Sequence, residues 1–323
     1  MKKIVIFTSG GDSPGMNACV RAAVRTAMFH GVEVIGSVRG FEGMINNDFI
    51  ELNSRSVSNI VQRGGTILKT ARSKGFMTTE GRKKAYDHLM LQGIEGMICI
   101  GGNGSFTGAK TFYEEYGIPC IGAPGTIDND LYGTDYTIGF DTAVNTAVEA
   151  IDKIRDTADS HDRVFFIEVM GRHAGFIALA AGIAGGAESI LIPESSEDWH
   201  KMLDLFMGNN PSKKAFSIVV VAEGEEHGGA LEIVAKLKEM DPKFEARVTI
   251  LGHIQRGGSP TAYDRVLASR LGNAAVEALL RGETNKMAGI KHNMIVFTSF
   301  DDAINKTKHL NPDLLRLVDV FNC

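Results

Sequence analysis

Short apolar runs alternate along the chain with longer segments in which apolar residues recur every three or four positions. The runs are rich in β-branched residues and mostly lack an apolar–polar alternation, which is typical of strands that are covered on both faces. They predict strands at residues 3–8, 96–100, 118–123, 163–169, 188–192, 216–222, 248–251 and 294–298. The longer segments predict helices, among them residues 17–29 and 142–157.

A strand followed by a helix, repeated along the chain, predicts an α/β fold with mostly parallel sheets. Most glycine-rich turns directly follow a predicted strand, and the carboxyl edge of an open α/β sheet is where ligands bind. The length of 323 residues suggests about two domains. Because no linker or low-complexity stretch divides the chain, we expect two α/β lobes that share a cleft.

Composition narrows the classes of function. The net charge of −5 argues against nucleic acid or an anionic membrane as a partner. No apolar run approaches the roughly 20 residues of a membrane span, and the amino terminus lacks the apolar run of a signal peptide. Cys19, Cys99, Cys120 and Cys323 show no metal-binding spacing, and two of them lie inside apolar runs as expected for buried thiols. These features fit a cytoplasmic protein.

Two glycine-rich loops each lie between a predicted strand and a predicted helix. The first is Thr-Ser-Gly-Gly-Asp-Ser-Pro-Gly-Met-Asn at residues 8–17, and the second is Gly-Gly-Asn-Gly-Ser-Phe-Thr-Gly at residues 101–108. Glycine lets the backbone approach an anion, and a helix amino terminus adds free N–H groups and a partial positive charge. Either loop alone could be a tight turn capped by Asn17, Asn103 or Ser105. Two such loops on one sheet edge favour a nucleotide or a polyphosphate as the ligand.

The most informative segment is Pro-Gly-Thr-Ile-Asp-Asn-Asp at residues 124–130, which follows a predicted strand. It presents the hydroxyl of Thr126 and the carboxylates of Asp128 and Asp130. Such carboxylates can serve as a general base and as a metal ligand. The first loop lacks both the Gly-Lys-Ser/Thr end of a Walker A loop and the G-x-G-x-x-G spacing of a dinucleotide site. A dinucleotide-dependent oxidoreductase is therefore disfavoured.

Five segments, in this order, resemble the bacterial ATP-dependent 6-phosphofructokinase family. They lie at residues 10–17, 101–105, 124–130, 170–175 (Met-Gly-Arg-His-Ala-Gly) and 251–260 (Leu-Gly-His-Ile-Gln-Arg-Gly-Gly-Ser-Pro). The resemblance runs from residue 1 to about residue 285. It implies two Rossmann-like three-layer lobes, with mostly parallel sheets and an active-site cleft between them. Residues 1–138 and about 253–305 would form the ATP-binding lobe, and residues 139–252 and about 306–323 the fructose 6-phosphate-binding lobe.

The resemblance implies Mg²⁺-dependent transfer of the γ-phosphoryl group of ATP to the 1-hydroxyl of fructose 6-phosphate, the committed step of glycolysis. Asp128 would be the general base, with Thr126 beside the transferred group and Arg172 and Gly11 stabilising its charge. The implied ATP-binding residues are Gly11, Phe41, Arg72, Ser73, Gly102, Asn103, Gly104, Ser105 and Gly108. The implied sugar phosphate-binding residues are Thr126, Asp128, Arg163, Met170, Gly171, Arg172, Glu223, Arg247, His253 and Arg256. Asn103 and Asp130 would lie near Mg²⁺.

The resemblance also implies a homotetramer with shared active sites, because Arg163 and Arg247 would reach the sugar phosphate from a neighbouring subunit. An allosteric site for ADP or phosphoenolpyruvate would lie at subunit contacts. Its implied residues are Arg21, Arg25, Arg155, Glu188 and Lys214. Ser54 and Asn59 stand where the family commonly has an arginine and an aspartate, so regulation is less firmly implied than catalysis.

Departures from the family pattern bear on the metal and the donor. Asn103 replaces a usual aspartate, which predicts weaker metal binding without loss of activity. Phe41 replaces a usual tyrosine and keeps the ring. Gly104 and Gly125 leave room for an adenosine-bearing donor. Diphosphate-using relatives typically carry an aspartate and a lysine at these two places, so ATP is favoured as the donor. A non-catalytic sugar phosphate-binding paralogue and a diphosphate-dependent enzyme remain as alternatives.

Overall fold

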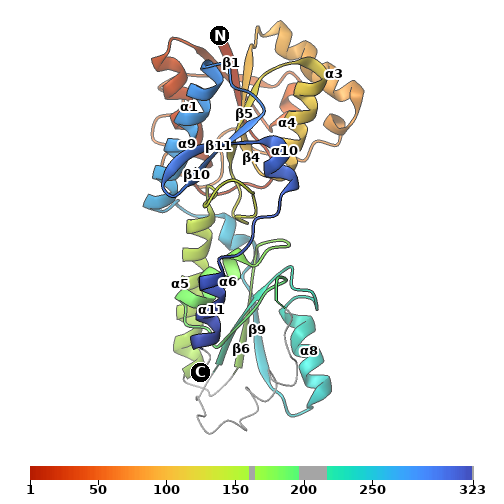
Figure 1. Cartoon of the computed structure of the whole chain (residues 1–323), viewed down its shortest axis with the longest axis vertical. Helices are drawn as coiled ribbons and strands as arrows, with labels where there is room; N and C mark the ends of the chain where they lie inside the picture. Colours follow the sequence, from red (N-terminus) through yellow and green to blue (C-terminus); the bar gives the residue numbers. More distant parts are fainter. Residues whose placement is uncertain (160–163, 196–216, 322–323) are drawn as a thin grey trace. The chain divides into compact units, whose positions relative to one another are not determined.

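The computed structural model describes residues 1–159, 164–195 and 217–321 (Figure 1). The chain forms two compact units. Unit 1 comprises Met1–Ile127, Leu131–Thr142 and Arg256–Lys308, and unit 2 comprises Asp128–Asp130, Ala143–Gln255 and His309–Cys323. The predicted starts of two strands, Arg163 and Phe216, lie outside the described residues.

Unit 1 is built on a sheet that has seven strands among the described residues, in the order β11-β10-β5-β4-β1-β2-β3. The strands are β1 (Lys3–Thr8), β2 (Glu33–Ser37), β3 (Phe49–Leu52), β4 (Gly96–Gly101), β5 (Cys120–Pro124), β10 (Lys286–Lys291) and β11 (Met294–Ser299). The edge strands β3 and β11 pair antiparallel, and the inner strands pair parallel. Because β2 and β4 lie on opposite sides of β1, the strand order reverses between β1 and β4. Such a switch point opens a crevice at the carboxyl ends of the strands.

Helices cover both faces of this sheet (Figure 1). On one face lie α1 (Met16–Phe29) and α9 (Ala262–Leu280), and on the other lie α2 (Phe41–Ile45), α3 (Thr79–Leu91), α4 (Asn103–Tyr116) and α10 (Phe300–Asn305). Alternate residues of β1 serve the two cores, as the strand period of two requires. Ile4 and Ile6 join the core under α1 and α9, whereas Val5 and Phe7 join the core under α3 and α4.

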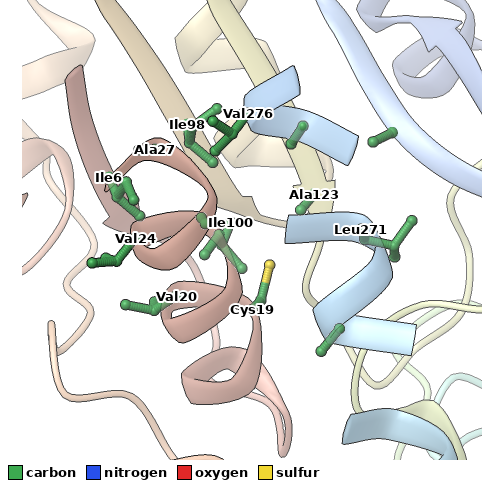
Figure 2. Close-up of a cluster of buried hydrophobic side chains, with 14 of the residues drawn as sticks. Ile6, Cys19, Val20, Val24, Ala27, Ile98, Ile100, Ala123, Leu271 and Val276 are labelled. Atoms are coloured by element: carbon green, nitrogen blue, oxygen red, sulfur yellow. The ribbon is translucent and has the colours of Figure 1, made fainter. Parts of the chain in front are cut away.

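The core under α1 and α9 is shown in Figure 2, where side chains of both helices meet those of β1, β4 and β5. Cys19 and Val20 come from α1, and Leu271 comes from α9. The two helices approach closely at Gly272, where a Cβ atom would lie 2.6 Å from the Cys19 carbonyl oxygen. A side chain is therefore not tolerated at this crossing. The packed helices and strands form a rigid base for the loops that follow β1, β4 and β5.

Unit 2 is built on a parallel sheet that has four described strands, in the order β7-β8-β6-β9. They are β6 (Val164–Val169), β7 (Ser189–Leu191), β8 (Ser217–Ala222) and β9 (Ala246–Ile250). On one face α8 (Ala230–Met240) packs Ile233 and Leu237 against Phe166, Val219 and Val221. The other face carries α6 (Phe176–Ala184), which contacts β7, β8 and α11 (Pro312–Phe321). α5 (Phe140–Asp159) begins in unit 1 and continues into unit 2.

The structure confirms the predicted α/β fold with mostly parallel sheets. The strands β2, β3 and β10 were not predicted from the sequence, and α5 begins two residues before its predicted start. Cys19, Cys99 and Cys120 are buried free thiols, and burial raises the pKa of each. Cys323 lies outside the described residues. None of the described helices is both long enough and apolar enough to cross a membrane.

Candidate functional site

The three loops that follow β1, β4 and β5 meet at one edge of the unit 1 sheet. The backbone N–H of Ser9 donates to the carbonyl of Ile100 at 3.0 Å, and that of Gly125 donates to the carbonyl of Gly101 at 3.0 Å. The switch point of the sheet lies between β1 and β4, so this edge is where the topology favours a ligand. The structure therefore brings together the two glycine-rich loops and the start of the 124–130 segment.

The first loop leads into α1 without a side-chain cap. Gly15 is the N-cap residue, with a φ of 104° that favours glycine, and no side chain accepts from the first turn. Asn17 is not a cap: its Nδ2 donates to the carbonyls of Arg63 and Gly64 at 3.0 and 3.1 Å, and its Oδ1 accepts from Ile67 N at 2.7 Å. Asn17 thus holds residues 63–67 against the first loop, a role that the sequence analysis missed.

The second loop ends at the open amino terminus of α4. Gly102 is the N-cap residue, no side chain caps the helix, and its first turn holds no acidic residue. Asn103 and Ser105 therefore do not act as the caps considered from the sequence. Gly104 is exposed, and a Cβ atom there would have no neighbour within 4 Å. Free N–H groups, a partial positive charge and open space make this helix end suitable for a phosphate group.

The 124–130 segment is buried up to Asn129 and is held by the residues that lead into α5. Thr137 Oγ1 donates to the carbonyl of Thr126 at 2.6 Å, and Ile138 N donates to the carbonyl of Pro124 at 2.8 Å. A Cβ atom at Gly102 would lie 3.7 Å from Thr126 Cβ, so Thr126 borders the second loop. Asp128 follows two residues later with a side chain that is 4% exposed.

Arg256 places a positive charge on the first loop. Its Nη1 donates to the carbonyl of Asp12 at 3.3 Å, and a Cβ atom at Gly11 would lie 2.4 Å from the same nitrogen. A side chain at residue 11 would therefore displace the guanidinium. Arg256 was predicted to bind the sugar phosphate, and within unit 1 it lies beside the predicted nucleotide loop.

Several predicted ATP-binding residues gather around Phe76, which the sequence analysis did not single out. The Phe41 ring is 6% exposed and stacks on Phe76 with ring centres 4.0 Å apart. A Cβ atom at Gly108 would lie 3.0 Å from the Phe41 ring. Ser73 Oγ donates to Glu42 Oε2 at 2.5 Å and accepts from Phe76 N at 3.1 Å. The neighbouring Arg72 is exposed.

In unit 2, predicted sugar phosphate-binding residues lie at the carboxyl ends of β6 and β8, which are adjacent. Glu223 Oε1 accepts from the backbone N–H groups of Arg172 and Gly171 at 2.8 and 3.3 Å. Arg172 has a φ of 57°, which is unusual for a residue with a side chain, and it is exposed. Met170 is buried beside them. His253, in the short helix η2 (Gly252–Arg256), is exposed.

Arg247 is not at that edge of unit 2. It pairs in register with Phe165, four residues before Val169, at the end of β6, and so lies roughly 13 Å from the carboxyl edge. Its side chain is exposed. Arg163 lies outside the described residues. Within one chain the structure therefore does not bring Arg247 to the residues that surround Glu223.

The predicted effector residues are divided between the units. In unit 2, Arg155 Nη2 donates to the carbonyls of Gly185 and Gly186, and Nη1 lies 4.0 Å from Glu188 Oε1. Glu188 Oε2 accepts from Ile218 N at 2.7 Å, so both charged groups are tied to the local backbone. Arg21 and Arg25 lie on α1 in unit 1, half-buried and exposed respectively. Lys214 lies outside the described residues.

The predicted metal-binding residues offer an amide oxygen and a carboxylate. Asn103 is the first residue of α4, and Asp130 is half-buried at the end of the 124–130 segment. Oxygen donors of this kind suit Mg²⁺, which needs only one or two protein ligands when phosphate oxygens complete its shell. The described residues hold no cluster of three or more His, Cys, Asp or Glu side chains that could cage a metal. The donor set thus fits an ion that binds together with phosphates.

The two glycines expected to leave room for a large donor differ from each other. Gly104 faces open space, as expected. At Gly125 a Cβ atom would lie 2.9 Å from Met16 Cε and 3.1 Å from Ile100 Cγ2, so a side chain there would require the end of Met16 to shift. The space around Gly125 is thus more restricted than that around Gly104.

Comparisons with known proteins agree with one another. A family model described as "Phosphofructokinase" matches residues 3–279. The chain is 59% identical over 322 residues to the ATP-dependent 6-phosphofructokinase of Cytophaga hutchinsonii, covering 100% of this chain and 98% of that protein. It is 59% identical over 321 residues to ATP-dependent 6-phosphofructokinase 1 of Thermus thermophilus, covering 99% of each. A solved phosphofructokinase from Saccharomyces cerevisiae matches with a TM-score of 0.88 and 35% identity over 100% of this chain, which spans 47% of the yeast chain.

Proposed function

The chain belongs to the phosphofructokinase family, and on that premise we propose that it is an ATP-dependent 6-phosphofructokinase. It transfers the γ-phosphoryl group of ATP to the 1-hydroxyl of fructose 6-phosphate and releases fructose 1,6-bisphosphate and ADP. The observation that carries this proposal is the meeting of three loops at the switch point of unit 1: two glycine-rich loops and the segment that leads to Thr126 and Asp128.

Unit 1 supplies the ATP side of the reaction. The open amino terminus of α4 suits the phosphate groups, because Gly102 and Gly104 leave its N–H groups accessible. Gly11 contributes its backbone where a side chain would displace Arg256. The remaining residues that we assign to ATP are Phe41, Arg72, Ser73, Asn103, Ser105 and Gly108. Phe41 already stacks on Phe76, which supports a role for this aromatic pair in forming the wall of the nucleoside site.

Phosphoryl transfer depends mainly on positioning and on electrostatic stabilisation of the transferred group. Asp128 is the base that accepts the proton of the 1-hydroxyl, and its burial in a region of low dielectric strengthens each electrostatic interaction that it makes. Thr126 lies next to the second loop, beside the group in transfer. Arg172 and the backbone N–H of Gly11 stabilise its negative charge.

Asp130 and Asn103 would hold Mg²⁺ together with phosphate oxygens of the nucleotide. When bound, the ion neutralises charge on the phosphates. Because Asn103 contributes a neutral oxygen where an aspartate would contribute a charge, we infer a lower affinity for the metal.

The sugar phosphate is bound by Met170, Gly171, Arg172 and Glu223 in unit 2, with His253 and with Arg256 from the first-loop region. The hydrogen bonds from Gly171 and Arg172 to Glu223 support this assignment, because they fix the carboxylate at the strand ends. The distance of Arg247 from that edge supports its action in a neighbouring subunit, in company with Arg163. A homotetramer with shared active sites is the assembly that we propose.

Regulation by ADP or phosphoenolpyruvate is a further part of the proposal. Arg155 and Glu188 lie together in unit 2, and Arg21 and Arg25 extend from α1. With Lys214 these residues would form an effector site where subunits meet. We also propose the cytoplasm as the site of action.

The test is the formation of fructose 1,6-bisphosphate from fructose 6-phosphate in Mg²⁺, with ATP and diphosphate compared side by side. We expect turnover with ATP and none with diphosphate. Turnover with diphosphate alone would make the chain a diphosphate-dependent enzyme. A protein that binds fructose 6-phosphate and turns over with neither donor would be a non-catalytic paralogue.

A further inference from the structure

A buried carboxylate outside the assigned site holds the start of α5. Asp264, in the first turn of α9, is fully buried. Its Oδ1 accepts from Gly139 N at 2.9 Å, and its Oδ2 accepts from Thr142 N at 2.8 Å and from Thr142 Oγ1 at 2.5 Å. None of the roles assigned above uses this group. A buried charge is costly unless hydrogen bonds compensate it, and here three donors provide that compensation.

The segment that Asp264 anchors also holds the loops of the site. Thr137 and Ile138, just before the anchored residues, donate to the carbonyls of Thr126 and Pro124. Gly139 packs against the first loop, where a Cβ atom would lie 2.6 Å from Ser13 Cβ. One carboxylate therefore fixes a short stretch of backbone that touches two of the three loops.

The anchor is reinforced by caps that α5 and α9 make for each other. Thr261 is the N-cap of α9 and accepts from Asp264 N at 3.2 Å. The Thr261 hydroxyl donates to Asp141 Oδ2 at 2.6 Å, and the Thr261 N–H donates to Thr142 Oγ1 at 3.0 Å. Since each helix start supplies partners for the other, loss of the carboxylate would loosen both.

We propose that Asp264 is a positioning residue for phosphoryl transfer, which acts by fixing the backbone that presents Thr126 and borders the first loop. The inference rests on the proposed function, because it concerns the alignment of that site. Displacement of reacting groups by about 1 Å can cost about 100-fold in rate, so an anchor of this kind has a measurable effect.

Protonation would release the anchor. Burial raises the pKa of Asp264 to about 6, the nearby Asp141 on α5 adds to this, and the hydrogen bonds from Thr142 and Gly139 oppose it. Tyr263 on α9 also faces this group and interacts with Tyr136. Once protonated, one carboxyl oxygen carries a hydrogen, and the anchor loses part of its capacity to accept. We expect kcat to fall on the acid side with an apparent pKa near 6.

Asp264→Asn tests the proposal at constant side-chain size. One of the two anchored N–H groups then faces an NH₂ group, so we expect kcat at pH 8 to fall about tenfold or more, with KM for both substrates within about twofold. The acid limb with an apparent pKa near 6 should disappear in this variant. Glu277→Gln, on the same helix, is the matched control and should behave as the wild type. A folded Asp264→Asn protein with wild-type kcat and an unchanged acid limb would overturn the proposal.

Two further measurements keep the test decisive. If Asp264→Asn does not fold, Thr142→Val removes one hydrogen bond to the carboxylate and Thr142→Ser keeps it. We expect kcat to fall for valine and to recover for serine, and equal kcat values for the three proteins would reject the anchor.

Amide hydrogen exchange at residues 139–142 should accelerate in Asp264→Asn whatever reaction the protein catalyses. If exchange accelerates in Asp264→Asn but the wild type has no 6-phosphofructokinase activity, the proposed function is refuted and the anchor is not. Unchanged exchange in Asp264→Asn would refute the anchor.

Discussion

Asp128 is the residue on which the proposed chemistry depends most directly. Its side chain is buried, and it follows Thr126 by two residues. We predict that Asp128→Asn lowers kcat by about 10²- to 10⁴-fold, because this is the usual contribution of a positioned general base. KM should change little, since the base acts mainly in the transition state.

Steady-state kinetics with ATP and fructose 6-phosphate provide the check for Asp128. Asp301→Asn is a suitable control, because Asp301 is an exposed acid on α10 that pairs with Lys110. A loss of less than tenfold in Asp128→Asn, with the control unchanged, would assign the proton transfer to another group.

At the residue scale, local sequence motifs identified more of the candidate site than the positions of apolar residues did. The glycine-rich loops and the 124–130 segment carry their chemistry in adjacent residues, so the sequence was sufficient to find them. Asp264 could not be found in this way, because its partner Gly139 is 125 residues away along the chain. Phe76 and the true partners of Asn17 escaped for the same reason: only the folded chain brings them to Phe41 and to residues 63–67.

At the scale of elements, the start of α1 does more than offer N–H groups. Through Asn17 it holds the loop that precedes Arg72, and Thr8 Oγ1 at the end of β1 supports the same loop by donating to Lys69 O at 2.9 Å. We predict that Asn17→Ala destabilises the protein by about 2–4 kcal/mol, because the carbonyls of Arg63 and Gly64 lose a donor and Ile67 N loses its acceptor. KM for ATP should rise as the loop before Arg72 loosens.

Urea unfolding and ATP kinetics measure the two effects of Asn17→Ala. Asn46→Ala is the matched control, since Asn46 is an asparagine at the end of α2 whose side chain makes an exposed hydrogen bond to Glu42. If both variants unfold at the same urea concentration as the wild type, the three hydrogen bonds of Asn17 do not hold the loop.

The apolar pattern of the sequence predicted some strands and did not predict others. Buried inner strands such as β1 and β4 were predicted within a residue, because their continuous apolar runs reflect burial on both faces. The edge strand β3 exposes two of its four residues, and so its pattern does not differ from that of a loop. In β10, lysines at both ends and a central glycine hide a buried core of four residues. Tertiary pairing, rather than local preference, makes these segments strands.

At the scale of the whole molecule, Asp264 makes folding stability depend on pH. The pKa of Asp264 is about 6 in the folded protein, above its ordinary value of 3.8, so the folded state binds this proton more tightly than the unfolded state. Binding of this proton contributes up to about 3 kcal/mol to the free energy of unfolding. That contribution is fully present below about pH 4 and is lost as pH rises to about 6. Relative to Asp264→Asn, the wild type should therefore lose stability between pH 4 and 6. Above pH 6 the difference in stability between the two proteins should be constant. Urea titrations at several pH values measure this difference, and a constant difference would contradict the assigned pKa.

Subunit mixing tests the proposed shared site. If Arg247 serves the site of a neighbouring subunit, a chain with Asp128→Asn and a chain with Arg247→Ala each form inactive homo-oligomers. Hybrid pairs would contain one site with both wild-type residues, so random mixing should recover about a quarter of wild-type activity. The two variants are refolded together and separately, and activity is measured at equal protein concentration. No recovery in confirmed hybrids would place Arg247 and Asp128 in sites of the same chain.

Gly125 has a consequence for how the donor preference can change over evolutionary time. A Cβ atom at this position would lie close to Met16 Cε and Ile100 Cγ2, so any larger residue here requires the end of the Met16 side chain to shift. Met16 is itself fully buried between the sheet and the helices above it. A lineage that gains a side chain at residue 125 would therefore have to repack Met16 at the same time. The choice of donor is in this sense coupled to the packing around Met16.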